Sequence, residues 1–416
     1  MRILILSQFY DPEPVVFPHE LAVGLKERGH EVSVITAIPN YPHDNIYPGY
    51  RMRPWIKEIR DGVTVMRLPL APDHSRSAKR RMLNYASFMA TSSLIGPWIN
   101  GKFDVMYVWH PPLTLGVSAW IIGMIKHIPF LYGVYDLWPE AVAATGISNN
   151  NLLMNSLRKL ERFVYRRAAA IAVISPGYKQ NLIGKGVPPK KIHVLTHWAD
   201  EYLFRPVPPK PELADSMGMA GRFNVLFGGN MGLAQALETV IEAAQRLTNY
   251  PEIQFVFAGD GIDLPKLEAL VRERSLPNVK FLGRQPYDLM PDLYAISDVL
   301  LAHYKKDPLF EISVPGKLFA YMACQKPVLM ASEGDSAKVV ESSGAGLTSP
   351  PEQPAAMAEA VLKLYRMTPQ ERATMGAAGR KAVEEQYSRR ILIDRHEELL
   401  AQICGVSTQA VPAHKS

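Results

Sequence analysis

The chain has 416 residues, of which 47% are hydrophobic and 21% are charged, so a disordered or fibrous chain is excluded. Its formal net charge of +6 fits an anionic partner, whether a nucleotide phosphate, a lipid headgroup or a nucleic acid. Only two cysteines occur, Cys324 and Cys404, which excludes a disulfide framework and a cysteine-rich zinc module and favours a reducing compartment.

The first half of the chain alternates apolar strands with helical patterns. Predicted strands cover residues 3–6, 31–35, 63–68, 105–108, 130–134 and 170–174, and predicted helices cover residues 19–28, 80–95, 113–126, 152–168 and 176–185. The longest weakly charged stretches, 83–100 and 113–125, are interrupted by polar residues or are too short to cross a bilayer. We therefore expect a protein that is soluble or peripheral to a membrane.

The stretch from 204 to 223 breaks this pattern, because it holds four prolines and two glycines, as linkers do. The alternation then restarts, with strands at 224–227, 254–258, 279–282, 299–303 and 327–330 and helices at 236–247, 264–275, 290–296, 315–323, 356–366, 369–387 and 389–403. Such alternation predicts two α/β domains with parallel sheets covered on both faces. We place them at 1–204 and 205–388, followed by a final helix at 389–405 and a tail at 406–416.

Ligands of open parallel sheets bind at the carboxyl ends of the strands. In the second domain, the first such loop is Gly228-Gly229-Asn230-Met231-Gly232, which leads into a helix near Gln235. Glycines let the backbone approach a ligand, and a helix N-terminus offers free N–H donors, so this loop predicts a phosphate site. The alternative is a tight turn with nothing bound. The loop Gly259-Asp260-Gly261 is a commoner turn and a weaker signal.

A basic residue lies near the start of the helix predicted over 315–323, in which Pro315 suits the first position. Lys317 falls in its first turn, where a lysine opposes the helix dipole unless an anion is bound there. Position 320 lies one turn further on the same face. Glu311 precedes the helix, where a carboxylate could accept hydrogen bonds from sugar hydroxyls. A solvated lysine and a helix-favouring glutamate are the alternatives.

In the first domain, Asp136, Trp138 and Glu140 follow a strand, where carboxylates suit sugar hydroxyls or proton transfer. The alternative is helix capping by Asp136 with Trp138 in the core. His110 follows another strand and is as consistent with a structural role as with a catalytic one.

Basic residues also gather beside apolar helical positions. Arg76, Lys79, Arg80 and Arg81 precede an apolar stretch that contains Phe88, and a second basic cluster lies within 158–167. This combination suits an anionic membrane surface, although a packed helix with a solvated face is an equal alternative. No DNA- or RNA-binding motif occurs, so we expect no nucleic-acid partner.

Several motifs together resemble one family over nearly the whole chain. In the first domain they are SQFYDPEP at 7–14, RGHEVSVIT at 28–36, IPNYP at 38–42, YPGY at 47–50, HSRSAKRRMLNYASF at 74–88, YDLWPEA at 135–141 and ISPGYK at 174–179. In the second they are GGNMGLAQALE at 228–238, FAGDG at 257–261, FLGRQP at 281–286 and PGKLFAYMACQKPVL at 315–329. The chain resembles bacterial glycosyltransferases of family 4, which have the GT-B fold of two Rossmann-like domains. The nearest likeness is to transferases of N-acetylaminosugars, such as fucosamine, in O-antigen, capsule and exopolysaccharide assembly.

This resemblance implies a retaining, metal-independent transfer of a sugar, here an N-acetylated deoxysugar, from a UDP-sugar to a polyprenyl-linked saccharide, with no cofactor. The enzyme would be cytoplasmic and peripheral at the inner, anionic face of the cell membrane. Donor-binding candidates are Gly229, Asn230, Gly232, Gln235, Asp260, Arg284, Gly316, Lys317 and Ala320. Acceptor-binding candidates are Trp138 and His110, catalytic candidates are Asp136, Glu140 and Glu311, and membrane-contact candidates are Arg76, Lys79, Arg80, Arg81 and Phe88.

The chain departs from the family pattern at three places. Pro14-Val15-Val16-Phe17 stands where many members have a Gly-Gly pair, and Gln235 stands where many have a lysine, which shifts phosphate neutralisation toward Lys317. Ala320 replaces a glutamate, and the other glutamate of the pattern is displaced to Glu311. Two alternatives therefore stay open: an epimerase or hydrolase of nucleotide sugars on the same fold, and a catalytically silenced form that still binds a sugar nucleotide.

Overall fold

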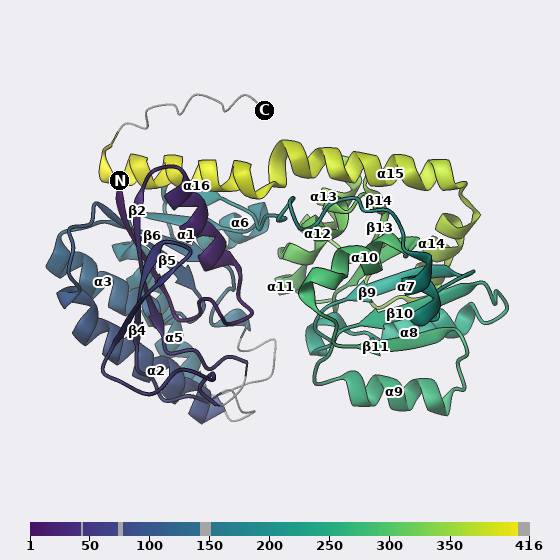
Figure 1. Cartoon of the computed structure of the whole chain (residues 1–416), viewed down its shortest axis with the longest axis horizontal. Coiled ribbons are helices and arrows are strands. Elements are labelled where there is room, and N and C mark those ends of the chain that lie inside the picture. Colours follow the sequence, from purple (N-terminus) through teal and green to yellow (C-terminus); the bar gives the residue numbers. More distant parts are fainter. Residues whose placement is uncertain (43–44, 74–77, 142–150, 407–416) are drawn as a thin grey trace. The chain divides into compact units, whose positions relative to one another are not determined.

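The computed structural model describes residues 1–42, 45–73, 78–141 and 151–406, except the side chains of residues 78 and 79, and its contacts divide the chain into two compact units (Figure 1). Unit 1 comprises Met1–Ile174, Tyr178–Leu195 and the residues from Ile393 onward, and unit 2 comprises Ser175–Gly177 and Thr196–Leu392. Each unit is an α/β structure with its own sheet, as the alternation of strands and helices predicts.

Unit 1 is built on an eight-stranded sheet in the order β3-β4-β2-β1-β5-β6-β7-β8. The strands are β1 (Arg2–Ser7), β2 (Glu31–Ala37), β3 (Ile56–Arg60), β4 (Val63–Leu68), β5 (Val105–His110), β6 (Phe130–Val134), β7 (Ala170–Val173) and β8 (Ile192–Val194). β1 and β5 are buried almost throughout, as expected for parallel strands that are covered on both faces.

The sequence pattern does not predict β3, which pairs antiparallel with β4. Its half-buried and exposed residues alternate, and it carries three charged side chains, as edge strands often do. The turn that joins the two strands has Asp61 at φ 46° and Gly62 at φ 72°, the left-handed backbone of a tight hairpin.

The helices of unit 1 pack closely where glycines face neighbouring side chains. They are α1 (Phe17–Glu27), α2 (Ala78–Ile95), α3 (Leu115–Lys126), α5 (Asn151–Arg167) and α6 (Pro176–Gly184), with 3-10 turns η1 (Gly96–Trp98) and η2 (Pro189–Lys191). A Cβ atom on Gly116 would lie 2.3 Å from Val164, which shows how tightly α3 meets α5. On α1, Gly24 similarly faces Ile393 of the last helix, α16 (Arg389–Cys404).

Unit 2 has a six-stranded parallel sheet in the order β11-β10-β9-β12-β13-β14. The strands are β9 (Phe223–Gly228), β10 (Ile253–Ala258), β11 (Val279–Gly283), β12 (Val299–His303), β13 (Val328–Ala331) and β14 (Gly346–Ser349). Two clusters of buried apolar side chains form its core. Because the strands are parallel, the loops after β9, β10, β11 and β12 meet at one edge.

The helices of unit 2 are α7 (Pro211–Ser216), α8 (Glu238–Arg246), α9 (Leu264–Glu273), α10 (Met290–Ala295), α11 (Pro308–Glu311), α12 (Gly316–Ala323), α13 (Asp335–Ser343), α14 (Pro354–Arg366) and α15 (Pro369–Ala382), with 3-10 turns η3 (Leu233–Gln235) and η4 (Tyr287–Leu289). α7 lies inside the stretch expected to be a linker, because Pro211 suits the first turn of a helix. The helix expected over 369–387 changes to π-helical geometry, η5, at Val383–Tyr387.

Candidate functional site

The glycine loop, residues 228–232, follows β9 and is held by backbone hydrogen bonds to the neighbouring loop after β10. The N–H of Gly229 donates to the carbonyl of Ala258 at 2.9 Å, and the N–H of Met231 donates to that of Asp260 at 2.8 Å. A Cβ atom on Gly259 would lie 1.9 Å from the Gly229 carbonyl oxygen. The weak Gly-Asp-Gly signal therefore marks the packing partner of the glycine loop.

Gln235 is used inside the turn that follows the glycine loop. Its Oε1 accepts from the N–H of Gly232 at 3.1 Å, and its own N–H donates to the Gly232 carbonyl at 3.0 Å. Asp260 is similarly occupied, because its Oδ1 accepts from the N–H of Gly261 at 2.7 Å, and it is exposed at the edge of the sheet. Both predicted residues lie at the expected edge, and both stabilise its loops.

Lys317 meets the glycine loop from helix α12. Its Nζ lies 4.1 Å from the ring centroid of Phe227, and 3.0 Å from the point where Gly229 would carry a Cβ atom. Burial lowers the pKa of Lys317 to about 8. The structure therefore brings together Gly229 and Lys317, two predicted donor residues 88 positions apart, at one edge of the sheet. An ammonium group beside a glycine, where a ligand can approach the backbone closely, is suited to an anion.

The other predicted residues of unit 2 lie around this edge. Gly316 begins α12 directly after Pro315, and Ala320, one turn beyond Lys317, is only 9% exposed. Arg284 is exposed just after β11, beside Gly283, whose carbonyl accepts from the N–H of Gly259 at 2.8 Å. Asn230 is exposed within the glycine loop.

Glu311 ends the short helix α11 and is half-buried. Its carbonyl oxygen lies 2.0 Å from the point where Gly334 would carry a Cβ atom, and Gly334 has φ 75°. Glycine at 334 therefore allows the two segments to pack, which places Glu311 against the start of α13.

Sequence reasoning missed two histidines of unit 2. His197 faces the start of α12, with its Cβ 3.6 Å from where Gly316 would carry one, and burial lowers its pKa to about 4. His303 ends β12 and contacts the turn after the glycine loop. Nothing in the local sequence marks either residue, since each becomes notable only through a contact distant in the chain.

In unit 1, His110 ends β5 and is 1% exposed. Its ring packs between Tyr132 and Trp138, at centroid distances of 5.7 and 6.2 Å. Neither ring nitrogen has a hydrogen-bond partner among the residues that the structure describes. Burial lowers the pKa of His110 to about 3, so the ring is neutral at physiological pH. The structure thus brings His110 and Trp138 together, as expected for a shared site.

The two predicted carboxylates of unit 1 have different surroundings. Asp136 is exposed just after β6, at the carboxyl edge of the sheet. Glu140 instead pairs with Lys185 at 2.8 Å, and Lys185 also pairs with the buried Glu161 at 2.6 Å. This ion pair provides a structural role for Glu140, so Asp136 is the carboxylate better placed for chemistry.

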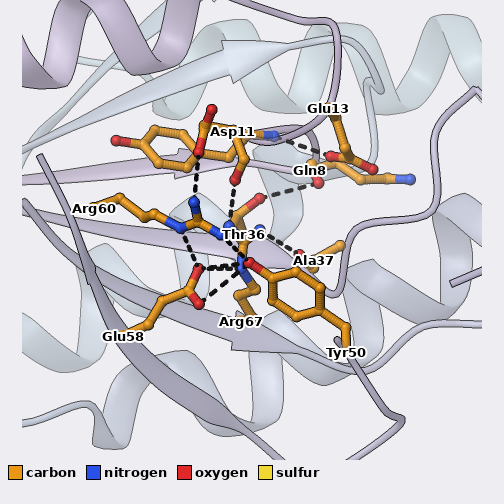
Figure 2. A network of polar contacts seen from close by, with 10 residues as sticks. Gln8, Asp11, Glu13, Thr36, Ala37, Tyr50, Glu58, Arg60 and Arg67 are labelled. Atoms are coloured by element: carbon orange, nitrogen blue, oxygen red, sulfur yellow. Dashed lines mark hydrogen bonds and ion pairs between the residues drawn. The ribbon is translucent and has the colours of Figure 1, made fainter. Parts of the chain in front are cut away.

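Sequence reasoning also missed the polar network that holds the loop after β1 (Figure 2). Glu13 is 4% exposed, and its carboxylate accepts from the backbone N–H groups of Tyr10, Asn40 and Tyr41 at 3.1, 2.8 and 2.8 Å. It therefore ties the loop after β1 to the loop after β2. Burial raises the pKa of Glu13, against the lowering effect of these three hydrogen bonds.

Arg67 is fully buried in the same network (Figure 2). Its Nε donates to Glu58 at 2.7 Å, its Nη2 donates to the carbonyl of Asp11, and the guanidinium lies 5.0 Å from the ring centroid of Tyr50. Arg60 bridges Tyr50 and Asp11 at the rim, at 2.5 and 3.4 Å. The loop after β1 is thus fixed from two sides.

The expected membrane contacts need one correction. Phe88 is wrong as a lipid contact, because it has no exposed surface and packs in the core of unit 1. Arg76 and the side chain of Lys79 lie outside the described residues, whereas Arg80 is exposed and Arg81 is half-buried. In the described parts of the chain, no helix is long and apolar enough to span a bilayer.

Two family matches follow the order of the units along the chain. Residues 14–198 match the Glycosyl transferase 4-like domain, and residues 222–367 match Glycosyl transferases group 1. WcaI of Escherichia coli (strain K12), named as a glycosyl transferase of colanic acid biosynthesis, is 26% identical over 80% of this chain and 84% of its own. WbjE of Pseudomonas aeruginosa, named as a glycosyltransferase, is 25% identical over 77% of this chain and 81% of its own.

Solved structures show the same fold. Anabaena Alr3699/HepE in complex with UDP has a TM-score of 0.72 at 17% identity and covers 97% of this chain and 100% of its own. Sucrose-phosphate synthase from Thermosynechococcus elongatus has a TM-score of 0.73 at 17% identity and covers 98% of this chain and 100% of its own. With a 4-like domain followed by a group 1 domain, and with two α/β units that match the fold of solved GT-B structures, the chain is a glycosyltransferase of the GT-B fold.

Proposed function

We propose that this glycosyltransferase moves a sugar, specifically an N-acetylated deoxysugar, from a UDP-sugar onto a lipid-linked saccharide during surface polysaccharide synthesis, with retention at the anomeric carbon. The observation that carries the proposal is the Lys317 ammonium group beside Gly229 of the glycine loop. The relative WcaI is named for colanic acid biosynthesis, and Alr3699/HepE was solved with UDP. The first name supports a polysaccharide product, and the second supports a nucleotide donor.

In this proposal, unit 2 binds the donor. Gly229, Asn230 and Gly232 let the loop backbone approach the diphosphate closely, and the Lys317 ammonium neutralises it, so charge stabilisation needs no metal. Arg284 lies beside the base, and Gln235, Asp260 and Gly316 shape the loops that contact the phosphates.

Unit 1 binds the acceptor in the same proposal. His110 and Trp138 contact its sugar, Asp136 is the leading catalytic carboxylate of this unit, with Glu140 secondary, and Glu311 of unit 2 contacts the donor sugar. The neutral ring of His110 packs against Trp138 without the cost of burying a charge.

Donor turnover with and without acceptor tests the function. UDP- and GDP-sugars are first screened by thermal shift, because a ligand that binds the folded state raises the melting temperature. A transferase then releases UDP only when a lipid-linked saccharide is present. Conversion of the sugar nucleotide in the absence of acceptor would instead identify an epimerase or a hydrolase.

Ala320 favours a second candidate, a silenced form that binds a sugar nucleotide without turnover. The resemblance places at this position a glutamate that accepts hydrogen bonds from the ribose hydroxyls. We expect Ala320→Glu to tighten UDP binding by about 1.5–3 kcal/mol if both bonds form. Calorimetry with UDP and assays of donor consumption check both effects, with Gln325→Glu at an exposed position just after the same helix as control. Unchanged UDP affinity, with full activity already present for Ala320, would rule out the ribose contact.

We further propose that the enzyme is cytoplasmic and docks on anionic lipid through α2, beside its lipid-linked acceptor. Leu83 and Leu94 of α2 and Trp98 of η1 are 60%, 71% and 75% exposed, and Arg80 lies at the start of the helix. Exposed apolar side chains next to cations suit the headgroup region of an anionic bilayer.

Liposome flotation tests this docking. We expect recovery with vesicles that contain anionic lipid and much less with neutral vesicles, because each cation near the surface contributes about 1 kcal/mol. Arg80→Glu with Arg81→Glu should reduce recovery, whereas Arg246→Glu on unit 2 serves as the matched charge reversal. Equal recovery with both vesicle types, unchanged by the double substitution, would contradict the proposal.

A further inference from the structure

The turn that follows the glycine loop is anchored to the end of β12 by a buried histidine. His303 is 2% exposed, and its Nδ1 lies 2.6 Å from the carbonyl oxygen of Gln235. A carbonyl only accepts hydrogen bonds, so Nδ1 must carry the proton. Gln235 is the residue whose side chain accepts from the N–H of Gly232. His303 therefore contacts the turn at the residue that closes the glycine loop.

The second ring nitrogen fixes the same tautomer independently. Nε2 of His303 lies 3.1 Å from the backbone nitrogen of Glu352, whose N–H donates to it. Nε2 must therefore be unprotonated, which leaves the neutral Nδ1–H form that the contact with Gln235 requires. Glu352 is itself held, because its Oε2 accepts from the N–H of Lys306 at 2.6 Å.

The turn needs this external support. Ala236, directly after Gln235, has φ 40°, a left-handed backbone that is unfavourable for a residue with a Cβ atom. A second bond from the same strand end helps to hold the turn, because the N–H of Lys305 donates to the carbonyl of Ala234 at 2.9 Å. The backbone conformation of the turn after Gly232 thus depends on the end of β12, a strand that begins 67 residues further along the chain.

We propose that His303 is a positioning residue that holds the glycine loop in the conformation that binds the donor diphosphate. The inference rests on the proposed function, which assigns that diphosphate to Gly229, Gly232 and Lys317. His303 acts through the Gln235 carbonyl and does not touch the nucleotide. A preorganised loop avoids the free-energy cost of ordering its backbone when the ligand binds.

Two amide substitutions separate the two hydrogen bonds of His303. The side-chain amide nitrogen of asparagine can replace Nδ1, so His303→Asn keeps a donor for the Gln235 carbonyl. The amide oxygen of glutamine can replace Nε2, so His303→Gln keeps an acceptor for Glu352 and loses the bond to the turn. His303→Ala loses both. Gln254→Ala is the matched control, because Gln254 is 5% exposed and makes two hydrogen bonds at the opposite edge of the same sheet.

Calorimetry with UDP and with uridine tests the inference on the full chain. We expect UDP affinity to fall about tenfold in His303→Gln and His303→Ala, the equivalent of one lost hydrogen bond, and to stay near the wild-type value in His303→Asn and Gln254→Ala. Uridine affinity should change little in any variant, and denaturation curves report the stability that each variant loses.

If the role of His303 is merely structural, UDP affinity should follow the stability of each variant, and Gln254→Ala should bind UDP as weakly as His303→Ala does. This result would overturn the inference. Equal losses of UDP affinity in His303→Asn and His303→Gln would also overturn the inference. If His303→Gln binds UDP as tightly as the wild type does, only the role of His303 is wrong. If the wild-type protein itself binds no UDP, the proposed function fails, and the inference fails with it.

Discussion

Arg67→Ala should lower the free energy of unfolding of unit 1 by about 3 kcal/mol, near the lower end of the range for breaking a buried ion pair. Arg67 is fully buried, whereas the Glu58 side chain is 22% exposed and can regain water once its partner is lost. The carbonyl of Asp11 would lose its guanidinium donor at the same time. Burial raises the pKa of Glu58, but Arg67 and Arg60 together hold it below its ordinary value. The Glu58 carboxylate is therefore charged in this network.

Urea denaturation followed by tryptophan fluorescence measures this loss. Five of the six tryptophans lie in unit 1, so the signal reports mainly on the unit that carries Arg67. Arg60→Ala is the control, because Arg60 is 36% exposed, and ion pairs of solvent-exposed side chains contribute about 1 kcal/mol or less to stability. If Arg67→Ala costs no more than Arg60→Ala, the buried guanidinium is not what holds the loop after β1.

Lys317→Ala should weaken UDP binding by about 1.5–3 kcal/mol, or roughly 10- to 150-fold, because a charge-assisted hydrogen bond to phosphate is lost. Uridine, which has no phosphate, should bind the variant and the wild type almost equally. Titration calorimetry with both ligands gives the comparison. The same loss for uridine as for UDP would mean that Lys317 supports the site in general and does not contact the diphosphate.

The pH dependence of UDP affinity gives a second readout of Lys317. Burial lowers its pKa to about 8 in the free protein, and a bound diphosphate should raise it, since the anion favours the charged form. Affinity should therefore be constant below pH 8 and fall by up to about tenfold per pH unit above it, because binding must then take up a proton. Lys317→Arg stays charged and should remove this dependence. A wild-type affinity that rises above pH 8 would contradict the assignment.

The sequence by itself determined the α/β class of both units and most of the strands, because buried parallel strands form apolar runs that are readable locally. The glycine loop and the helix with Lys317 were also predictable, since each is a local signal at the end of a strand. The short or polar strands β3, β8 and β14 were not, because their pairing partners supply the stability that their own residues do not indicate.

Only the tertiary structure decided which side chains meet. It brought Lys317 to Gly229, used Gln235 to close the glycine loop, and buried Phe88, which a helical pattern alone placed beside lipid. It also revealed Arg67 and His303, whose partners lie up to 68 positions away in the chain. The physical reason is that burial and hydrogen-bond partners are set by packing between distant segments, whereas the local sequence specifies only the strand or helix on which a residue stands.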